Sequence, residues 1–170
     1  GSYLWSPQKL DTPTGNQPTP INFLKLKETN PKKAFVYYKK YEARITCKVA
    51  KASLHSKQTL ETLNLRKIKR QRINNFKTLH KLLKTQNRFR IGIHSNEVPL
   101  CYPFWPKKKQ SRDELIAKGL YLPKYWQEVE TRAKGYLFEK TIAKDWLFLP
   151  IDQRYSQKDM TRIAELINPS

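Results

Sequence analysis

Apolar side chains in the first half of the chain recur at helical spacing. Between residues 32 and 50, Phe35, Tyr38, Tyr41 and Ile45 are three or four positions apart, so the pattern predicts a helix with these residues on one face. The segment 53–56 is predicted to interrupt this pattern. A second, longer helix is predicted from about Leu60 to Leu83, with an apolar stripe made of Leu65, Ile68, Phe76, Leu79 and Leu83.

The second half of the chain shows short apolar runs instead, and these predict strands. Pro99 and Pro103 suit an edge strand or the ends of a strand, because proline has no amide hydrogen to donate. Hydrophobic character predicts four strands, at residues 89–93, 98–104, 120–122 and 146–149.

Helices are predicted between and after these strands. Ser111 followed by Glu114 has the spacing of a capping box, and Gly119 is a suitable closing residue. Residues 127–143 are predicted to form one helix that buries Val129, Ala133, Leu137 and Ile142. Ser156 and Asp159 predict a second capping box, which begins a final helix that buries Met160, Ile163, Leu166 and Ile167.

Together these elements predict an α/β (α+β) fold, in which two long helices precede a small sheet covered by helices. The first 30 residues differ from the rest, because Gly1 and Ser2 are interpreted as an expression scar and residues 7–21 are rich in proline. We therefore predict a linker or extended arm over residues 1–30 and one domain over residues 31–170.

The positive charge is concentrated in one part of the chain. The net charge is +20, and residues 31–90 alone carry 18 basic and 2 acidic side chains. Such a local field attracts nucleic acid, anionic lipid or phosphorylated ligands, although a solvated lysine-rich surface has the same composition. The candidate anion-binding residues lie on the second predicted helix and are Arg66, Lys67, Lys69, Arg70, Arg72 and Lys77.

Motifs for metal binding and catalysis are missing from the sequence. The three histidines are scattered, and neither Cys47 nor Cys101 has a neighbour at ligand spacing, so no metal site is predicted. No nucleophile elbow and no glycine-rich phosphate loop occur. Both cysteines are interpreted as reduced, which favours a cytoplasmic protein, and no segment has the length and apolarity of a transmembrane span.

Residues 145–167 form the most distinctive run of the sequence, DWLFLPIDQRYSQKDMTRIAELI. A leucine–proline step ends a strand, Asp152, Arg154 and Tyr155 follow, and Ser156 then begins a helix. Proline can end the strand, Asp152 and Arg154 can pair across the turn, and Ser156 can cap the helix. This run resembles the C-terminal signature of the DegT/DnrJ-type aminotransferases, which use pyridoxal phosphate (PLP) and act on keto groups of nucleotide-linked sugars.

Other segments resemble the same family in the same order, so that the resemblance covers about residues 32–168. It implies a domain like the small domain of a fold-type I aminotransferase, which closes one side of the substrate cleft. The upstream segments are Phe35–Arg44, then Arg72, Asn75, Phe76 and Leu79, then residues 98–103, and then residues 120–126. The aromatic residues that the resemblance places towards a sugar or nucleotide are Tyr102, Trp105, Tyr121, Tyr125 and Trp126.

The resemblance also implies what this chain lacks. The large domain of the family, with its Schiff-base lysine and cofactor phosphate site, would precede residue 30 and does not appear in the sequence. We therefore expect no PLP in this chain, no catalytic residue, and a structural role for Asp152 and Arg154 in their turn. A large domain or a dimer partner would complete the site.

Three functions follow as expectations. The first is a non-catalytic C-terminal domain or fragment of an aminotransferase-like protein. The second is a basic module that binds nucleic acid or another polyanion through residues 31–90. The third is an adaptor that uses a degenerate aminotransferase fold to hold a protein partner, because fold alone does not determine function.

Overall fold

The computed structural model describes residue 26, residues 29–43 and residues 51–168. The chain divides into two compact units, residues 1–63 and residues 64–170. Each unit is described by itself below. The described helices include none that is long and apolar enough to cross a membrane.

The first unit contains helix α2, Pro31–Glu42, and helix α3, Leu54–Glu61. Asn30 caps α2, since its side chain accepts a hydrogen bond from the Lys33 amide. The helix itself is confirmed over these residues, and Phe35 and Tyr38, at helical spacing, are 61% and 41% exposed, whereas Ala34 is buried. The rest of the predicted helix, including Ile45, falls outside the described residues.

Helix α3 corrects the prediction of an interruption at residues 53–56. The Ser53 side chain accepts a hydrogen bond from the Ser56 amide at 3.2 Å, so the serine begins a helix rather than breaking one. The long helix α4 consequently starts later than predicted and spans Leu65–Leu83, with Asn64 as its N-cap. Cap residues determined both boundaries, whereas the prediction used apolar spacing alone.

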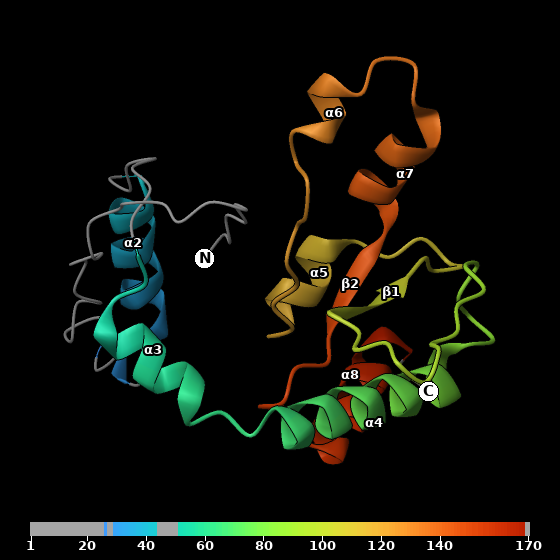
Figure 1. Ribbon diagram of the computed structural model, residues 1–170. Coiled ribbons are helices and arrows are strands. Elements are labelled where there is room, and N and C mark those ends of the chain that lie inside the picture. The colour runs from blue at the N-terminus through green and yellow to red at the C-terminus, as the bar shows by residue number, and fades with distance from the viewer. Residues whose placement is uncertain (1–25, 27–28, 44–50, 169–170) are drawn as a thin grey trace. The chain divides into compact units, whose positions relative to one another are not determined.

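The second unit is a mixed α+β structure built around a two-stranded antiparallel sheet. Strand β1 pairs with β2 so that Tyr102 lies opposite Leu149. Helices α4 and α8 pack together on one side, and α6 and α7 lie at the other end of β2 (Figure 1). After α4 the elements are β1 (Cys101–Phe104), α5 (Arg112–Ala117), α6 (Val129–Arg132), α7 (Leu137–Asp145), β2 (Leu147–Pro150) and α8 (Gln157–Ile167).

The sheet is smaller than the sequence predicts. Residues 89–93 and 120–122 form no strand, although Ile91, Ile93, Leu120 and Leu122 still contact the core. In each of these two segments, a side chain forms a hydrogen bond that a neighbouring strand would otherwise form. The side-chain oxygen of Asn87 accepts a hydrogen bond from the Phe89 amide, and the Arg112 side chain donates two hydrogen bonds to the Leu122 carbonyl.

The predicted helix over residues 127–143 is two short helices, α6 and α7. Gly135 separates them with a φ of 85°, a left-handed conformation that ends a helix and favours glycine. Leu137, predicted to be buried, is 78% exposed at the start of α7. At Ser111 the capping box is also incomplete, because this side chain accepts from the Asp113 amide and no described hydrogen bond joins Ser111 to Glu114.

The core lies between α4, the sheet and α8. Phe76, Leu79 and Leu83 of α4 face Met160 and Ile163 of α8, and all five side chains are buried. The capping box predicted for α8 is confirmed, because Ser156 and Asp159 exchange hydrogen bonds in both directions. This box fixes where α8 leaves the turn that follows β2, and so directs its apolar face onto α4.

Candidate functional site

Two segments 76 residues or more apart meet at a buried asparagine. The side-chain amide of Asn75 on α4 donates to the carbonyls of Ile151, Asp152 and Tyr155, at 3.2, 3.1 and 3.0 Å. Gln71, one helical turn earlier, also donates to the Tyr155 carbonyl at 2.9 Å. Because Asn75 has no exposed surface, these bonds are shielded from water and hold the turn after β2 against α4.

Arg72 lies beside Asn75 and connects α4 to a second segment. Its guanidinium donates to the carbonyls of Pro99 and Leu100 at 3.1 and 3.2 Å, and to the Gln153 side chain at 3.3 Å. Arg72 therefore differs from the other five anion-binding candidates, because its guanidinium already donates hydrogen bonds to backbone carbonyls of the chain. Its position joins the start of β1 to the turn after β2.

Asp152 and Arg154 form an ion pair within that turn. Two side-chain hydrogen bonds join them, at 2.8 and 2.9 Å, and the Arg154 amide donates to the same carboxylate at 3.0 Å. The side-chain bonds from Arg154 lower the pKa of Asp152, against a smaller opposing effect of burial. The pair stiffens the turn, which fits the structural role expected from the sequence.

The five aromatic candidates occupy three different environments. Tyr102 is fully buried against Phe76 and His80, so its side chain contributes to the core. Trp105 is half-buried at the end of β1, and Tyr121 is 68% exposed. Tyr125 and Trp126 pack on Phe148 of β2, with ring centroids at 5.1 and 6.1 Å from that ring, and Trp126 remains 56% exposed.

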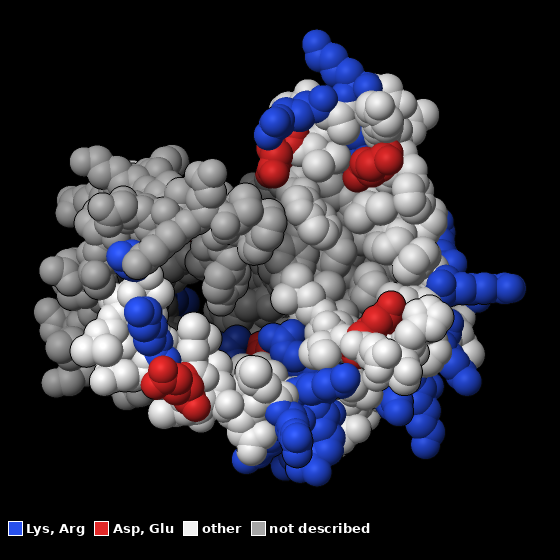
Figure 2. Space-filling model, in the orientation of Figure 1, with Lys and Arg blue, Asp and Glu red and all other residues white. Residues whose placement is uncertain are grey.

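Five basic residues form a stripe along α4. Arg66, Arg70, Lys77, Lys81 and Lys84 recur at helical spacing, and all five are exposed. Figure 2 shows basic side chains gathered on the surface over α4. No acidic residue occurs between positions 62 and 96, and none of the five forms an ion pair with a described residue. Arg66, Lys67 and Arg70 also line a shallow hollow of about 360 Å³. The name α4 stripe is used below for Arg66, Arg70, Lys77, Lys81 and Lys84.

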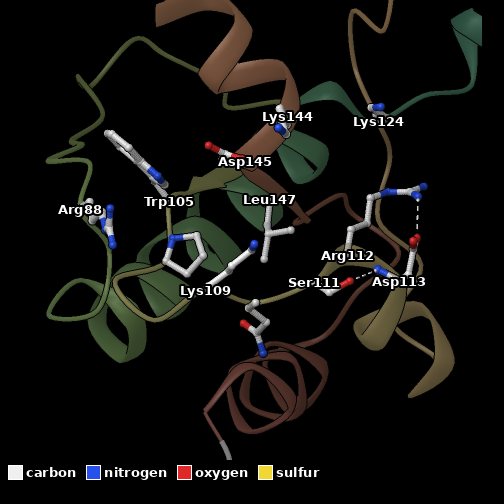
Figure 3. Close-up of a pocket in the computed structure, with 12 residues that line it drawn as sticks. Arg88, Trp105, Lys109, Ser111, Arg112, Asp113, Lys124, Lys144, Asp145 and Leu147 are labelled. Atoms are coloured by element: carbon white, nitrogen blue, oxygen red, sulfur yellow. Dashed lines mark hydrogen bonds and ion pairs between the residues drawn. The ribbon is translucent and has the colours of Figure 1, made fainter.

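A cleft of about 600 Å³ opens elsewhere on the second unit. Arg88 and Trp105 lie on one side, Arg112 and Lys124 lie on the opposite side, and Lys109 lies between them (Figure 3). Apart from Trp105, the sequence analysis singled out none of these cleft residues. The one available signal was the run of three lysines at 107–109 close to the half-buried Trp105, and no spacing rule covers such a run.

Chemistry that depends on thiols or metals finds no support in the described residues. Cys101 is a free thiol, and burial raises its pKa to about 11, so it is protonated at neutral pH. Cys47 lies outside the described residues. Within them, no group of three or more histidine, cysteine or acidic side chains is arranged to hold a metal ion.

Comparison with protein-family models, curated proteins and solved structures finds no match for this chain. A function for this chain is therefore inferred from the residues themselves and from the contacts described above.

Proposed function

We propose that this chain is a non-catalytic C-terminal domain of an aminotransferase-like protein of the DegT/DnrJ type. The observation that carries the proposal is the contact between Asn75 and the turn at residues 151–155. Both segments belong to the sequence resemblance. The Asn75 side chain supplies the hydrogen-bond donor, and the turn supplies the carbonyl acceptors. The polar residues of the resemblance thus have one common structural purpose, which is to hold α4 against the end of β2.

In this proposal the chain contributes a substrate-facing wall and no cofactor chemistry. PLP requires a lysine in a closed pocket, a carboxylate for its ring nitrogen and a cup for its phosphate. Every lysine whose side chain is described is exposed or half-buried, so these residues do not fit the cofactor. The exposed aromatic surface of Tyr121, Tyr125 and Trp126 would pack against a sugar or base of a nucleotide-linked sugar.

The proposal is tested by following the tryptophan indole signals of the full chain during titration with a UDP-linked hexose. The Trp126 signal should shift in a saturable way, and Trp126→Ala should weaken binding, whereas the buried Trp146 should stay in place. Absence of any shift at Trp126 would contradict the substrate-facing role. In parallel, excess PLP with borohydride reduction should leave no lysine labelled specifically, and one labelled lysine would contradict the domain assignment.

A second function, binding of a polyanion, is favoured by the α4 stripe. At a rise of 1.5 Å per residue the stripe extends about 27 Å, which approaches one turn of a nucleic-acid duplex. Its five cations have no acidic partner among the described residues, so a phosphate backbone would meet little competition. Aromatic residues are not interleaved with the stripe, which favours a duplex over a single strand.

Fluorescence anisotropy with a labelled DNA duplex tests this second function. Affinity should fall steeply with added salt, because bound cations release counterions from the phosphates. The triple variant Arg66→Glu, Arg70→Glu and Lys77→Glu should lose binding. Its matched control, Lys118→Glu with Lys134→Glu and Lys158→Glu, changes the same charge on exposed residues elsewhere. Equal loss in both variants, or no binding at low salt, would contradict a site on α4.

A further inference from the structure

The cleft in Figure 3 is built from segments that are held firmly in place. On one side, the buried Asn87 side chain donates to the Pro103 carbonyl at 3.0 Å and accepts from the Trp105 amide at 2.9 Å. The Arg88 amide donates to the Trp105 carbonyl at 2.8 Å. These bonds fix the backbone that carries Arg88 and Trp105, so this wall of the cleft exists before any ligand arrives.

The opposite side is held by Arg112. Its Nε and one terminal nitrogen donate to the Leu122 carbonyl at 3.0 and 2.7 Å, which ties the segment containing Lys124 to the start of α5. Lys124 itself pairs with Glu130 at 2.8 Å. Arg112 and Lys124 therefore contribute positive potential to the cleft while their main contacts are made within the chain.

Two other lysines line the cleft and make no such contact with a described residue. Lys109 and Lys144 are exposed and form no ion pair with a described residue. Figure 3 shows the ammonium group of Lys109 directed into the space between the two walls. Arg88 lies over the Trp105 ring at 5.6 Å, which keeps its guanidinium at the edge of the same space.

The charge balance of the cleft is positive. It contains five basic side chains and two acidic ones, which leaves a net charge of +3. Asp113 lies 3.7 Å from the Arg112 guanidinium and is 91% exposed, so much of its charge is directed to solvent. Asp145, next to Lys144, is the acidic group of the cleft that forms no ion pair with a described residue.

We propose that this cleft binds a di- or triphosphate group, with Lys109 and Lys144 as its main ligands and Arg88 beside Trp105 as the third cation. A compact multivalent anion fits because the lysines approach it from different segments, the loop before α5 and the end of α7. The volume of about 600 Å³ leaves room for a ligand of that class. This site shares no residue with the α4 stripe or with Tyr121, Tyr125 and Trp126, so it does not rest on either function proposed above.

Calorimetric titration of the full chain with tripolyphosphate, without divalent cations, tests the proposal. The double variant Lys109→Gln/Lys144→Gln should bind about tenfold more weakly or worse, since each lysine supplies a charge-assisted hydrogen bond. The matched control Lys118→Gln/Lys134→Gln removes the same charge from exposed positions outside the cleft and should bind like the original chain. An equal loss in both variants, or no binding by the original chain, overturns the proposal.

Asp145→Asn provides a test with the opposite sign. Removing this unpaired negative charge should strengthen tripolyphosphate binding about threefold, a gain that no loss of folding could imitate. Unchanged or weaker binding in this variant places the anion elsewhere and overturns the assignment.

Two further arms distinguish the source of the phosphates. If a nucleotide supplies them, ATP should bind more tightly than tripolyphosphate, and Trp105→Leu should remove that advantage while keeping tripolyphosphate affinity. If phosphate alone is recognised, ATP and tripolyphosphate should bind equally and Trp105→Leu should affect neither. Both results support the site, whereas an ATP affinity that is unchanged in the Lys109→Gln/Lys144→Gln variant contradicts it.

Discussion

Asn75 illustrates how much of this fold depends on a single polar residue. It is one of two buried polar residues in the described chain, and the other, Asn87, performs a similar task at the opposite end of β1. Asn75 satisfies carbonyls of the turn after β2, and Asn87 satisfies backbone groups at the end of β1. Side-chain amides thus replace the missing edges of a small sheet.

Replacement of Asn75 by alanine should destabilise the chain by about 2–3 kcal/mol, because buried carbonyls would lose their donors. Urea unfolding followed by circular dichroism measures this loss. The adjacent Asn74 is exposed, so Asn74→Ala is the matched control and should change stability by no more than about 0.5 kcal/mol. Similar losses for both variants would show that the buried contact of Asn75 is not the cause.

Asp152 should make stability depend on pH in the acidic range. The Arg154 side chain lowers the pKa of Asp152 in the folded chain below the unfolded value of about 3.9. A lowered folded pKa gives stabilisation above that pH, and the stabilisation is lost as pH falls through the folded pKa.

Comparison of Asp152→Asn with the original chain tests the direction of this pH dependence of stability. The variant should be less stable at pH 6, and the difference should shrink when unfolding is measured near pH 3. Glu165→Gln, at an exposed position without an ion pair to a described residue, serves as the control. A difference that is constant across this range would contradict a contribution from the carboxylate charge.

At the scale of elements, α4 carries charge that opposes its own helix dipole. Its first turn contains Arg66 and Lys67 and no acidic residue, although the N-terminus of a helix favours negative charge. The amphipathic packing of Phe76, Leu79 and Leu83 compensates within the core. A binding role for the α4 stripe would explain why basic residues stand where acidic ones would stabilise the helix.

Lys67→Glu should therefore stabilise the chain by about 0.5–1 kcal/mol, because a glutamate three residues after the Asn64 cap suits both the dipole and a capping box. Thermal and urea unfolding provide the measurement. Lys81→Glu makes the same exchange in the last turn and should destabilise instead. A loss of stability at position 67 would contradict the electrostatic argument.

At the scale of the whole molecule, the main hydrophobic cluster of the described residues belongs to the second unit. Every member of the main hydrophobic cluster lies between Phe76 and Ile167, and the division between the units falls at residues 63 and 64. The second unit thus has a core of its own, which is the physical requirement for independent folding.

Residues 64–170, expressed alone, should accordingly unfold in one cooperative transition with a midpoint close to that of the full chain. Urea denaturation followed by tryptophan fluorescence measures this. Asn75→Ala placed in the fragment should lower its stability as much as in the full chain. A fragment that lacks cooperative unfolding would show that residues 1–63 contribute to the core.

The local sequence determined α8, the capping box at Ser156 and the β2 strand, because each depends on neighbours within a few positions. Tertiary structure decided the rest. Residues 89–93 and 120–122 have strand-like sequences, but their backbone groups found partners on Asn87 and Arg112 instead of another strand. The contact of Asn75 with residues 151–155 and the cleft around Lys109 join distant segments, and local patterns carry no information about such pairs.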